Sequence, residues 1–446
     1  MDIAETTTGG QAARPATGQA PAARLAAASF VGTALEFFDF YAYGLAAALV
    51  LDQVFFPALD PVAGVLASFS TFAVAFLARP LGAVLFGHLG DRLGRRNTLV
   101  ASLVVMGGAT LAIGLLPGHA ELGVLAPALL VLLRFVQGLG VGGEWGGAAL
   151  LAAEHAPPGR RGRYALFTQL GPPAGFLLAN AAFLALDGLL TPAAFVTWGW
   201  RVPFLVSAVL VLVGLYVRLR LPETPAFRRV PVPARRSPLG ALLRSQPRRL
   251  LLGAGVMVVQ YTLFYLATAY CLSYGTAVLG MDRGVLLALT MAAVVGLAIT
   301  TALSALASDR WGRRPVLVCA CVVSAGWALV FFPLFDTADP ALVALALVGA
   351  LLAMGLGYGP MGAYLPELFV ATHRYTGAAL AYSLGGVLGG ALTPLIAVRL
   401  QAASGSGAVG AYLVCVALVS LGCALALRDT GPRARGVDPV SAATPP

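Results

Sequence analysis

Long apolar runs alternate with short polar turns along almost the whole chain, and this alternation sets the number of elements. A helix that crosses a bilayer needs about 20 mainly apolar residues, and twelve runs meet that length. They cover residues 25–51, 63–87, 97–117, 124–153, 163–186, 199–219, 250–278, 284–307, 315–335, 342–365, 377–399 and 409–427. The pattern therefore predicts an all-α membrane protein with twelve transmembrane helices.

A charged turn occurs twice, about half a chain apart. The motif DRLGRR at 91–96 follows the second apolar run, and DRWGRR at 309–314 follows the eighth, 218 residues later. An acidic helix end with a basic turn, at 154–161, returns 213 residues later at 367–374. Repeated six-helix halves are one known way to build a transporter, so the repeat predicts two pseudo-symmetric six-helix bundles.

A hydrophilic stretch separates the two halves. Residues 220–249 hold six prolines and eight arginines, a composition that cannot cross a bilayer. The first residues contain Ala, Thr, Gly and Pro without an apolar core, which is not the pattern of a signal peptide. The expected division is a disordered tail at 1–24, a bundle at 25–219, a linker at 220–249, a bundle at 250–427 and a tail at 428–446.

The distribution of arginine predicts the orientation. Arginine gathers in alternate turns, in the linker and in the C-terminal tail, whereas the opposite turns hold few. Cytoplasmic loops carry the excess of positive charge. We therefore expect a multi-pass protein of the plasma membrane with both termini, the linker and both charged turns on the cytoplasmic side.

Composition excludes several function classes. The chain is 59% hydrophobic and 11% charged, against about 25% charged residues in soluble domains, so lipid must surround it. The net charge of +10 comes without the aromatic and basic patch that binds nucleic acid. The sequence contains no hydrolytic triad, phosphate-binding loop or metal-ligand cluster, and its five cysteines form no CxxC pair. We expect neither an enzyme nor a bound cofactor or metal.

The charged loop and several further segments resemble a known superfamily. Gly87-x-x-x-Asp91-Arg92-x-Gly94-Arg95-Arg96 is similar to the signature loop of the major facilitator superfamily. Other segments resemble its metabolite:proton symporter family: EFFDFYAYG (36–44), ARPLGAVLFGHLGDRLGRR (78–96), RFVQGLGVGGEWGGAALL (134–151), GWRVPFL (199–205), PETPAF (222–227) and YGPMGAYLPELF (358–369). The resemblance implies inward, proton-coupled transport of small metabolites, commonly carboxylates such as shikimate or 2-oxoglutarate, or zwitterions such as betaine.

Five ionisable residues lie inside the predicted spans, all in the first half: Glu36, Asp39, Arg79, Arg134 and Glu144. Each costs about 2.5–3.5 kcal/mol on insertion scales, so each is a functional candidate. A carboxylate that carries protons must be able to exist in both its neutral and its charged form inside the membrane. We expect the carboxylates of this set to couple transport to protons and the arginines to bind substrate.

Asp39 and Arg134 are expected near the same depth. Asp39 lies about 20 Å from the start of its helix, and Arg134 about 15 Å from the outer start of its own. The two side chains can meet, with Glu36 one turn from Asp39 on the same face. The alternative interpretation is a static ion pair between the two helices, and for Arg79 a structural bond to a carbonyl or to Glu144.

The second half offers only neutral polar groups within its spans. Gln260, Tyr261 and Tyr265 lie on the first helix of that half, with Tyr261 and Tyr265 on one face. They are candidates for contacts with the substrate, and interhelical hydrogen bonds are the alternative.

The charged turns and helix ends are candidates for a cytoplasmic gate. Pairs between them can form in one conformation and break in the other, although positive-inside topology alone also explains the arginines. The candidates are Gly87, Asp91, Arg92, Gly94, Arg95, Arg96, Glu154, Arg161, Asp309, Arg310, Gly312, Arg313, Arg314, Glu367 and Arg374.

The sequence therefore favours proton-coupled symport of a small metabolite, with a carboxylate as the expected substrate. Efflux by proton antiport is the alternative, because GPPAG at 171–175 is similar to part of an exporter signature. A sensor without transport activity ranks below both, since no signalling domain is present. The expected partners are the substrate, protons and the lipid bilayer, with the monomer as the functional unit.

Overall fold

A computed structural model describes residues 22–93, 95–142, 160–220, 238–370 and 374–430, and the regular structure in these ranges is helical throughout. Six long helices form the first half: α1 (Ala22–Leu49), α3 (Pro61–Leu93), α4 (Arg95–Leu115), α6 (Leu125–Gly142), α8 (Arg161–Leu189) and α10 (Val202–Arg220). Short helices connect them at one end: α2 (Leu51–Phe55), α5 (His119–Leu122), α9 (Pro192–Thr197) and η1 (Gly199–Arg201).

Six long helices also form the second half, which α11 (Pro238–Ser245) precedes. Four of them are α14 (Arg283–Trp311), α15 (Arg313–Phe335), α16 (Pro340–Glu367) and α19 (Ser406–Ala426). Two contain a π-helical segment: α12 (Pro247–Tyr265) continues through η2 (Leu266–Tyr270) into α13 (Cys271–Ala277), and α17 (Arg374–Gly385) continues through η4 (Gly386–Ala391) into α18 (Leu392–Ser404).

Within the described ranges, ten of these helices are long and apolar enough to cross a membrane. The helix α1 and the helix α4, whose apolar part is Val100–Leu115, bring the long helices to the twelve that the sequence predicts. The fourth predicted span begins as expected, but its last part, 143–153, lies outside the described residues. The fold class is confirmed.

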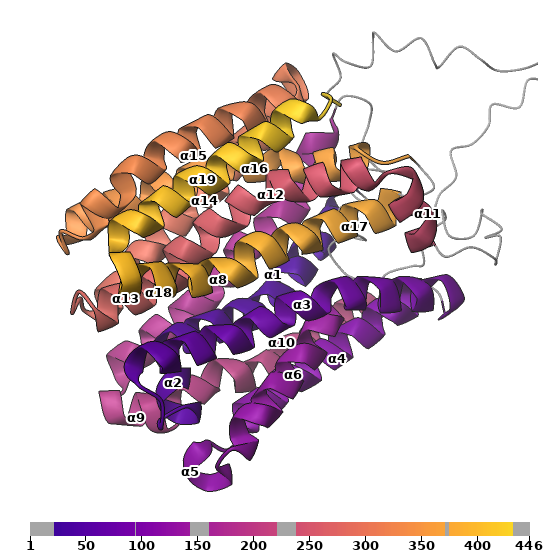
Figure 1. Ribbon diagram of the computed structural model, residues 1–446. Helices are drawn as coiled ribbons and strands as arrows, with labels where there is room; N and C mark the ends of the chain where they lie inside the picture. The colour runs from indigo at the N-terminus through magenta and orange to yellow at the C-terminus, as the bar shows by residue number, and fades with distance from the viewer. Residues whose placement is uncertain (1–21, 94, 143–159, 221–237, 371–373, 431–446) are drawn as a thin grey trace, which may run out of the picture.

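The helices gather into two bundles that lie side by side (Figure 1). In the first, α3 packs against α6, α4 against α10, and α1 against α8; in the second, α14 and α15 pack against α16, and α19 packs against α15 and α12. Two seams join the bundles, one between α8 and α14 and the other between α3 and the helix formed by α17, η4 and α18. Side chains of α1, α3, α12, α16 and α17 line the space between these seams, where the central site lies.

Glycines let α6 approach the backbone of α3 closely. A Cβ added at Gly138 would lie 2.2 Å from the Ala75 carbonyl oxygen, and one at Gly142 would lie 2.0 Å from the Arg79 carbonyl oxygen. Only glycine allows such an approach between two helix backbones. The glycine-rich sequence of α6 therefore fixes the part of α3 that carries Arg79.

We expect Gly138→Ala to lower the apparent melting temperature of the purified protein in detergent. The added methyl group overlaps the α3 backbone, and overpacking costs about 1–3 kcal/mol. The matched control is Gly108→Ala on α4, where an added Cβ has no neighbour within 4 Å and alanine favours the helix. Equal melting temperatures for the two variants would contradict the close packing of α6 on α3.

Candidate functional site

Two adjoining cavities lie between the bundles. The first is bordered by Glu36 of α1, Arg79 of α3 and Tyr382 of α17, and the second by Gln260 and Tyr261 of α12 and other side chains. Phe37 and Tyr382 line both. The free space in the larger cavity is about that of one water molecule. The bundles must therefore move apart before a metabolite can enter.

Arg79 supplies a buried positive charge to the first cavity. Its guanidinium carbon lies 4.1 Å from the centre of the Phe40 ring and 4.5 Å from that of Phe76, and its side chain is 2% exposed. None of its three guanidinium nitrogens has a hydrogen-bond acceptor in the described part of the chain. Buried donors without acceptors are costly, so this position suits an anionic group of a ligand.

The second bundle supplies uncharged polar groups to the second cavity. Gln260 is buried, and neither atom of its amide has a hydrogen-bond partner among the described residues. Gly357 of α16 makes room for this side chain, since a Cβ there would lie 2.0 Å from Gln260 Nε2. The amide can therefore both donate to and accept from a ligand.

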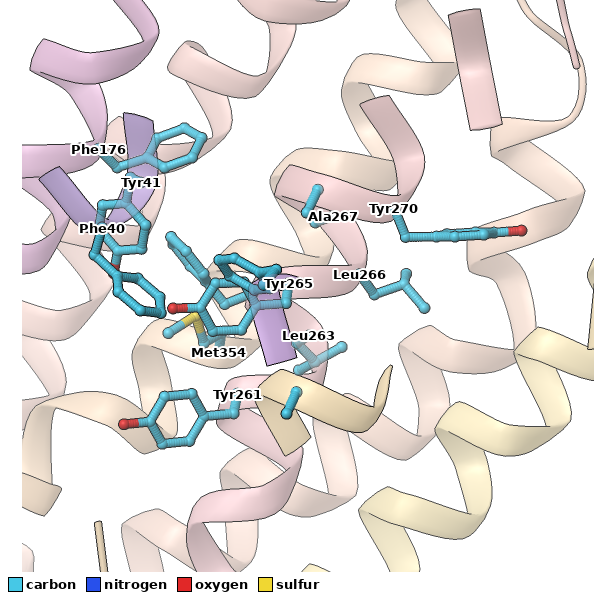
Figure 2. Close-up of a cluster of buried hydrophobic side chains, with 14 of the residues drawn as sticks. Phe40, Tyr41, Phe176, Tyr261, Leu263, Tyr265, Leu266, Ala267, Tyr270 and Met354 are labelled. Atoms are coloured by element: carbon cyan, nitrogen blue, oxygen red, sulfur yellow. The ribbon is translucent and has the colours of Figure 1, made fainter. Parts of the chain in front are cut away.

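Aromatic rings surround Gln260. Tyr261 and Tyr265 stack with their ring centres 6.2 Å apart, and Figure 2 shows both hydroxyls pointing to one side while Tyr270 points to the other. Tyr261 also meets Tyr382 edge to face at 5.3 Å. The structure brings Gln260, Tyr261 and Tyr265 together at one cavity, as the sequence predicts.

Arg134 occupies a different position from Arg79. Its guanidinium lies over the ring of Tyr43, 3.7 Å from the ring centre, and donates to the side chain of Gln137 and to the Phe72 carbonyl. It lines neither of the two cavities. Of the two arginines, it is Arg79 that the structure brings to the interface between the bundles.

Asp39 and Arg134 do not form the pair that the sequence suggests. Gln137, which accepts from Arg134, donates through Nε2 to the Thr110 hydroxyl at 2.7 Å. Asp39 lies beside the hydroxyls of Thr110 and Ser207, but neither carboxylate oxygen reaches hydrogen-bond distance of a partner in the described ranges. The Thr110 hydroxyl itself donates to the Met106 carbonyl at 3.0 Å, so neutral polar side chains lie between the carboxylate and the arginine without bonding to the carboxylate.

The other two carboxylate candidates have different outcomes. Glu36 is 5% exposed and borders the first cavity together with Arg79, whereas Asp39, three residues on, lines neither cavity. Glu144 lies outside the described residues. The sequence analysis missed Thr110, Gln137 and Ser207, because single hydroxyl and amide groups in apolar helices give no pattern.

Charged contacts join the two bundles where α8 begins and α14 ends. Asp309 accepts hydrogen bonds from the backbone amides of Gly162 and Arg163, both at 2.9 Å. Arg161 meets Glu367 at 3.4 Å. Arg313 joins the two acids, at 2.7 Å from Asp309 and 3.6 Å from Glu367. We call this set of contacts the inner latch.

The remaining gate candidates form no contact of the inner latch in the described ranges. Arg314 donates to the Ala424 and Leu425 carbonyls, and Gly312 separates α14 from α15 with φ +103°. Arg310 and Arg374 pair with no acid in the described ranges. Gly94 and Glu154 lie outside the described residues, as do the side chains at Asp91, Arg92, Arg95 and Arg96; Gly87 belongs to α3.

Comparison with known proteins identifies the relatives of the chain. Residues 29–394 match the sequence model of the Major Facilitator Superfamily. The inner membrane metabolite transport protein YhjE of Escherichia coli is 49% identical over 410 residues, which cover 90% of this chain and 93% of that protein. The shikimate transporter of Escherichia coli is 38% identical, and the match covers 92% of this chain and 95% of that protein. The proline/betaine transporter of Salmonella typhimurium is 33% identical, and the match covers 94% of this chain and 85% of that protein.

The fold also has solved counterparts. The xylose transporter XylE of Escherichia coli, in a partially occluded inward-open conformation, matches with a TM-score of 0.74. The match covers 92% of this chain and 98% of that one at 19% sequence identity. At this identity the likeness concerns the fold alone.

We expect Asp309→Asn to separate the inner ends of α8 and α14. Asparagine has no charged carboxylate with which to accept the two amide hydrogen bonds or to form the ion pair with Arg313. The arrangement in which the ends of α8 and α14 are held together therefore loses stability. Spin labels at the exposed positions Arg160 and Arg310, in a protein without its native cysteines, report the distance.

The variant should broaden the distance distribution toward longer values. The control is Asp282→Asn, because Asp282 caps the opposite end of α14 through Val285 N. A distribution identical to that of the unmodified chain would show that Asp309 does not hold the inner latch.

Proposed function

Since the chain belongs to the Major Facilitator Superfamily, we propose that it takes up a small carboxylate together with protons by alternating access. Its relatives are metabolite transporters, and the chain is a membrane transporter of small solutes, not an enzyme. The observation that carries the proposal is the guanidinium of Arg79, buried between the bundles with no acceptor in the described ranges.

A carboxylate is the chemistry that this guanidinium fits. The planar fork of an arginine can donate two parallel hydrogen bonds to a carboxylate, and such charge-assisted bonds are the strong ones. The guanidinium carbon lies over the rings of Phe40 and Phe76, and its nitrogens have no hydrogen-bond acceptor in the described ranges, so their N–H groups are available to a ligand. We assign the first contact with the substrate to Arg79, and we assign Arg134 to the polar cluster with Gln137 and Thr110.

Asp39 is our candidate for the proton site. It is buried beside Thr110 of α4 and Ser207 of α10, with no cation beside it in the described part of the chain, and burial without a counter-charge is costly for a carboxylate. An anion that binds at Arg79 adds a negative charge near α1, which disfavours the ionised form of Asp39 further. Substrate and proton are thereby expected to load together, since each makes the other more favourable.

Phe40 offers a physical connection between the two sites. It follows Asp39 on α1 and lies under both guanidinium groups, 4.1 Å from Arg79 and 5.2 Å from Arg134. A substrate that draws Arg79 away from this ring changes the packing of α1 next to the acid. The same helix therefore takes part in substrate binding and in the protonation step.

Uptake into proteoliposomes tests the proposed function. Radiolabelled shikimate, 2-oxoglutarate and betaine are offered outside vesicles with an acidic exterior, with and without a protonophore. Accumulation of an acid that the protonophore abolishes supports symport. Release of preloaded acid driven by the same gradient would instead establish antiport efflux, and transport of the zwitterion betaine alone would contradict a substrate with a net negative charge.

We expect Arg79→Gln to weaken binding of the transported acid at least about tenfold, since a charge-assisted contact is worth about 1.5–3 kcal/mol. Arg399→Gln, at the exposed outer end of α18, is the matched control and should bind as the unmodified chain does. The measurement is calorimetric titration of the purified protein. If Arg79→Gln binds normally while Arg134→Gln does not, Arg134 is the substrate ligand.

We expect Asp39→Asn to abolish accumulation against a gradient and to retain exchange of internal for external substrate, because asparagine imitates the protonated acid permanently. Both rates are measured on the same vesicles. Asp52→Asn in α2, outside the bundle core, serves as the control. Concentrative uptake by Asp39→Asn would exclude Asp39 as the coupling site and make Glu144 the leading candidate.

A further inference from the structure

The buried polar groups of the central site specify more than a carboxylate. From their arrangement we infer that the substrate is a monocarboxylate that carries hydroxyl groups, bound with its carboxylate at Arg79 and its hydroxylated end at Gln260. This inference rests on the proposed function and narrows the class of substrate. Its evidence is the charge and the hydrogen-bonding capacity of each cavity.

The two cavities differ in charge. The first holds Arg79 and Glu36, whereas none of the described residues that line the second is ionised at neutral pH. A second carboxylate on the ligand would enter the second cavity without a cation to receive it. Burying such a charge is expensive, so the site disfavours dicarboxylates.

The second cavity also disfavours a cationic group. Arg79 lies within electrostatic reach of the hydroxyls of Tyr261, Tyr265 and Tyr382, so its charge repels a cation placed among them. A quaternary ammonium group offers no hydrogen bonds to the Gln260 amide. The aromatic rings alone would suit such a group, but the buried amide would then stay without partners.

A hydroxyl group satisfies both ends of this amide. It donates one hydrogen bond and accepts others, and Gln260 presents an acceptor and a donor with no partner in the described ranges. The ring faces of Tyr261, Tyr265 and Tyr41 offer an apolar wall for the carbon skeleton. Both bundles thus hold the ligand, with the charged end on the first and the neutral end on the second.

Binding by matched compounds tests the inference on the purified, full-length protein. The chain series is gluconate, hexanoate, adipate and sorbitol, which share six carbons and differ in carboxylate and hydroxyl groups. The ring series is shikimate and its counterpart without hydroxyls, cyclohex-1-ene-1-carboxylate, and betaine is added as a zwitterion. A site built to bind a hydroxyl strongly rejects the analogue that lacks it.

We expect the hydroxylated acid of at least one series to bind at least about tenfold more tightly than its counterpart without hydroxyls, and than adipate. If adipate or the acids without hydroxyls bind as tightly, the inference fails although a carboxylate substrate stands. If only betaine or sorbitol binds, or no compound does, both the inference and the proposed function fail.

Variants of Gln260 locate the effect. Gln260→Leu and Gln260→Met should lower the affinity for the hydroxylated acid to that of its counterpart without hydroxyls. The affinity for that counterpart should stay unchanged. Gln401→Leu, at the outer end of α18, is the matched control and should preserve the preference. Arg79→Gln should weaken all acids alike, and a preference that survives both Gln260 variants would overturn the assignment of the hydroxyl contact.

Discussion

The central site depends on a positive charge that is enclosed between the bundles and whose guanidinium nitrogens have no hydrogen-bond acceptor in the described ranges. Arg79 keeps this charge because Phe40 and Phe76 offer it their ring faces, and cation–π contacts of desolvated groups are worth about 2 kcal/mol. Its nitrogens find no acceptor among the residues that the structure describes. In the proposed function, a bound anion relieves the cost of that arrangement.

The two bundles divide the chemistry between them. The first contains the ionisable groups Glu36, Asp39, Arg79 and Arg134, and the second contributes the amide of Gln260 and tyrosines. A ligand that contacts both bundles would stabilise the arrangement in which they lie close together, because each bundle alone offers hydrogen-bond partners to only part of the ligand. The π-helical segments η2 and η4 follow Tyr265 and Tyr382 closely, and such irregular turns often occur at functional sites.

Residues of the charged repeat form contacts of the inner latch, which positive-inside orientation alone does not explain. Asp309 bonds to the start of α8 in the other bundle, and Arg313 holds it and Glu367 in place. These bonds cross the boundary between the bundles at the end where α8 begins and α14 ends, so they must break before that end can open. At the opposite end of the same seam, Arg283 meets Asp187 at 3.4 Å, so α8 and α14 are joined by charge at both ends.

The sequence by itself determined the class of this protein and the number of its long helices. The reason is that the length of an apolar run is a local property, and this length must match the thickness of the bilayer. It also identified Arg79, Gln260 and Tyr261 as candidates, since polar groups in such runs stand out. Only the tertiary structure decided which of them meet. Arg79 and Arg134 are equal in the sequence, but the close packing of α6 on α3 brings one to the cavity, whereas Tyr43 and Gln137 enclose the other. The place of Asp39 beside Thr110 and Ser207 was likewise beyond the sequence, because these residues lie on three helices whose relative rotation is set by packing.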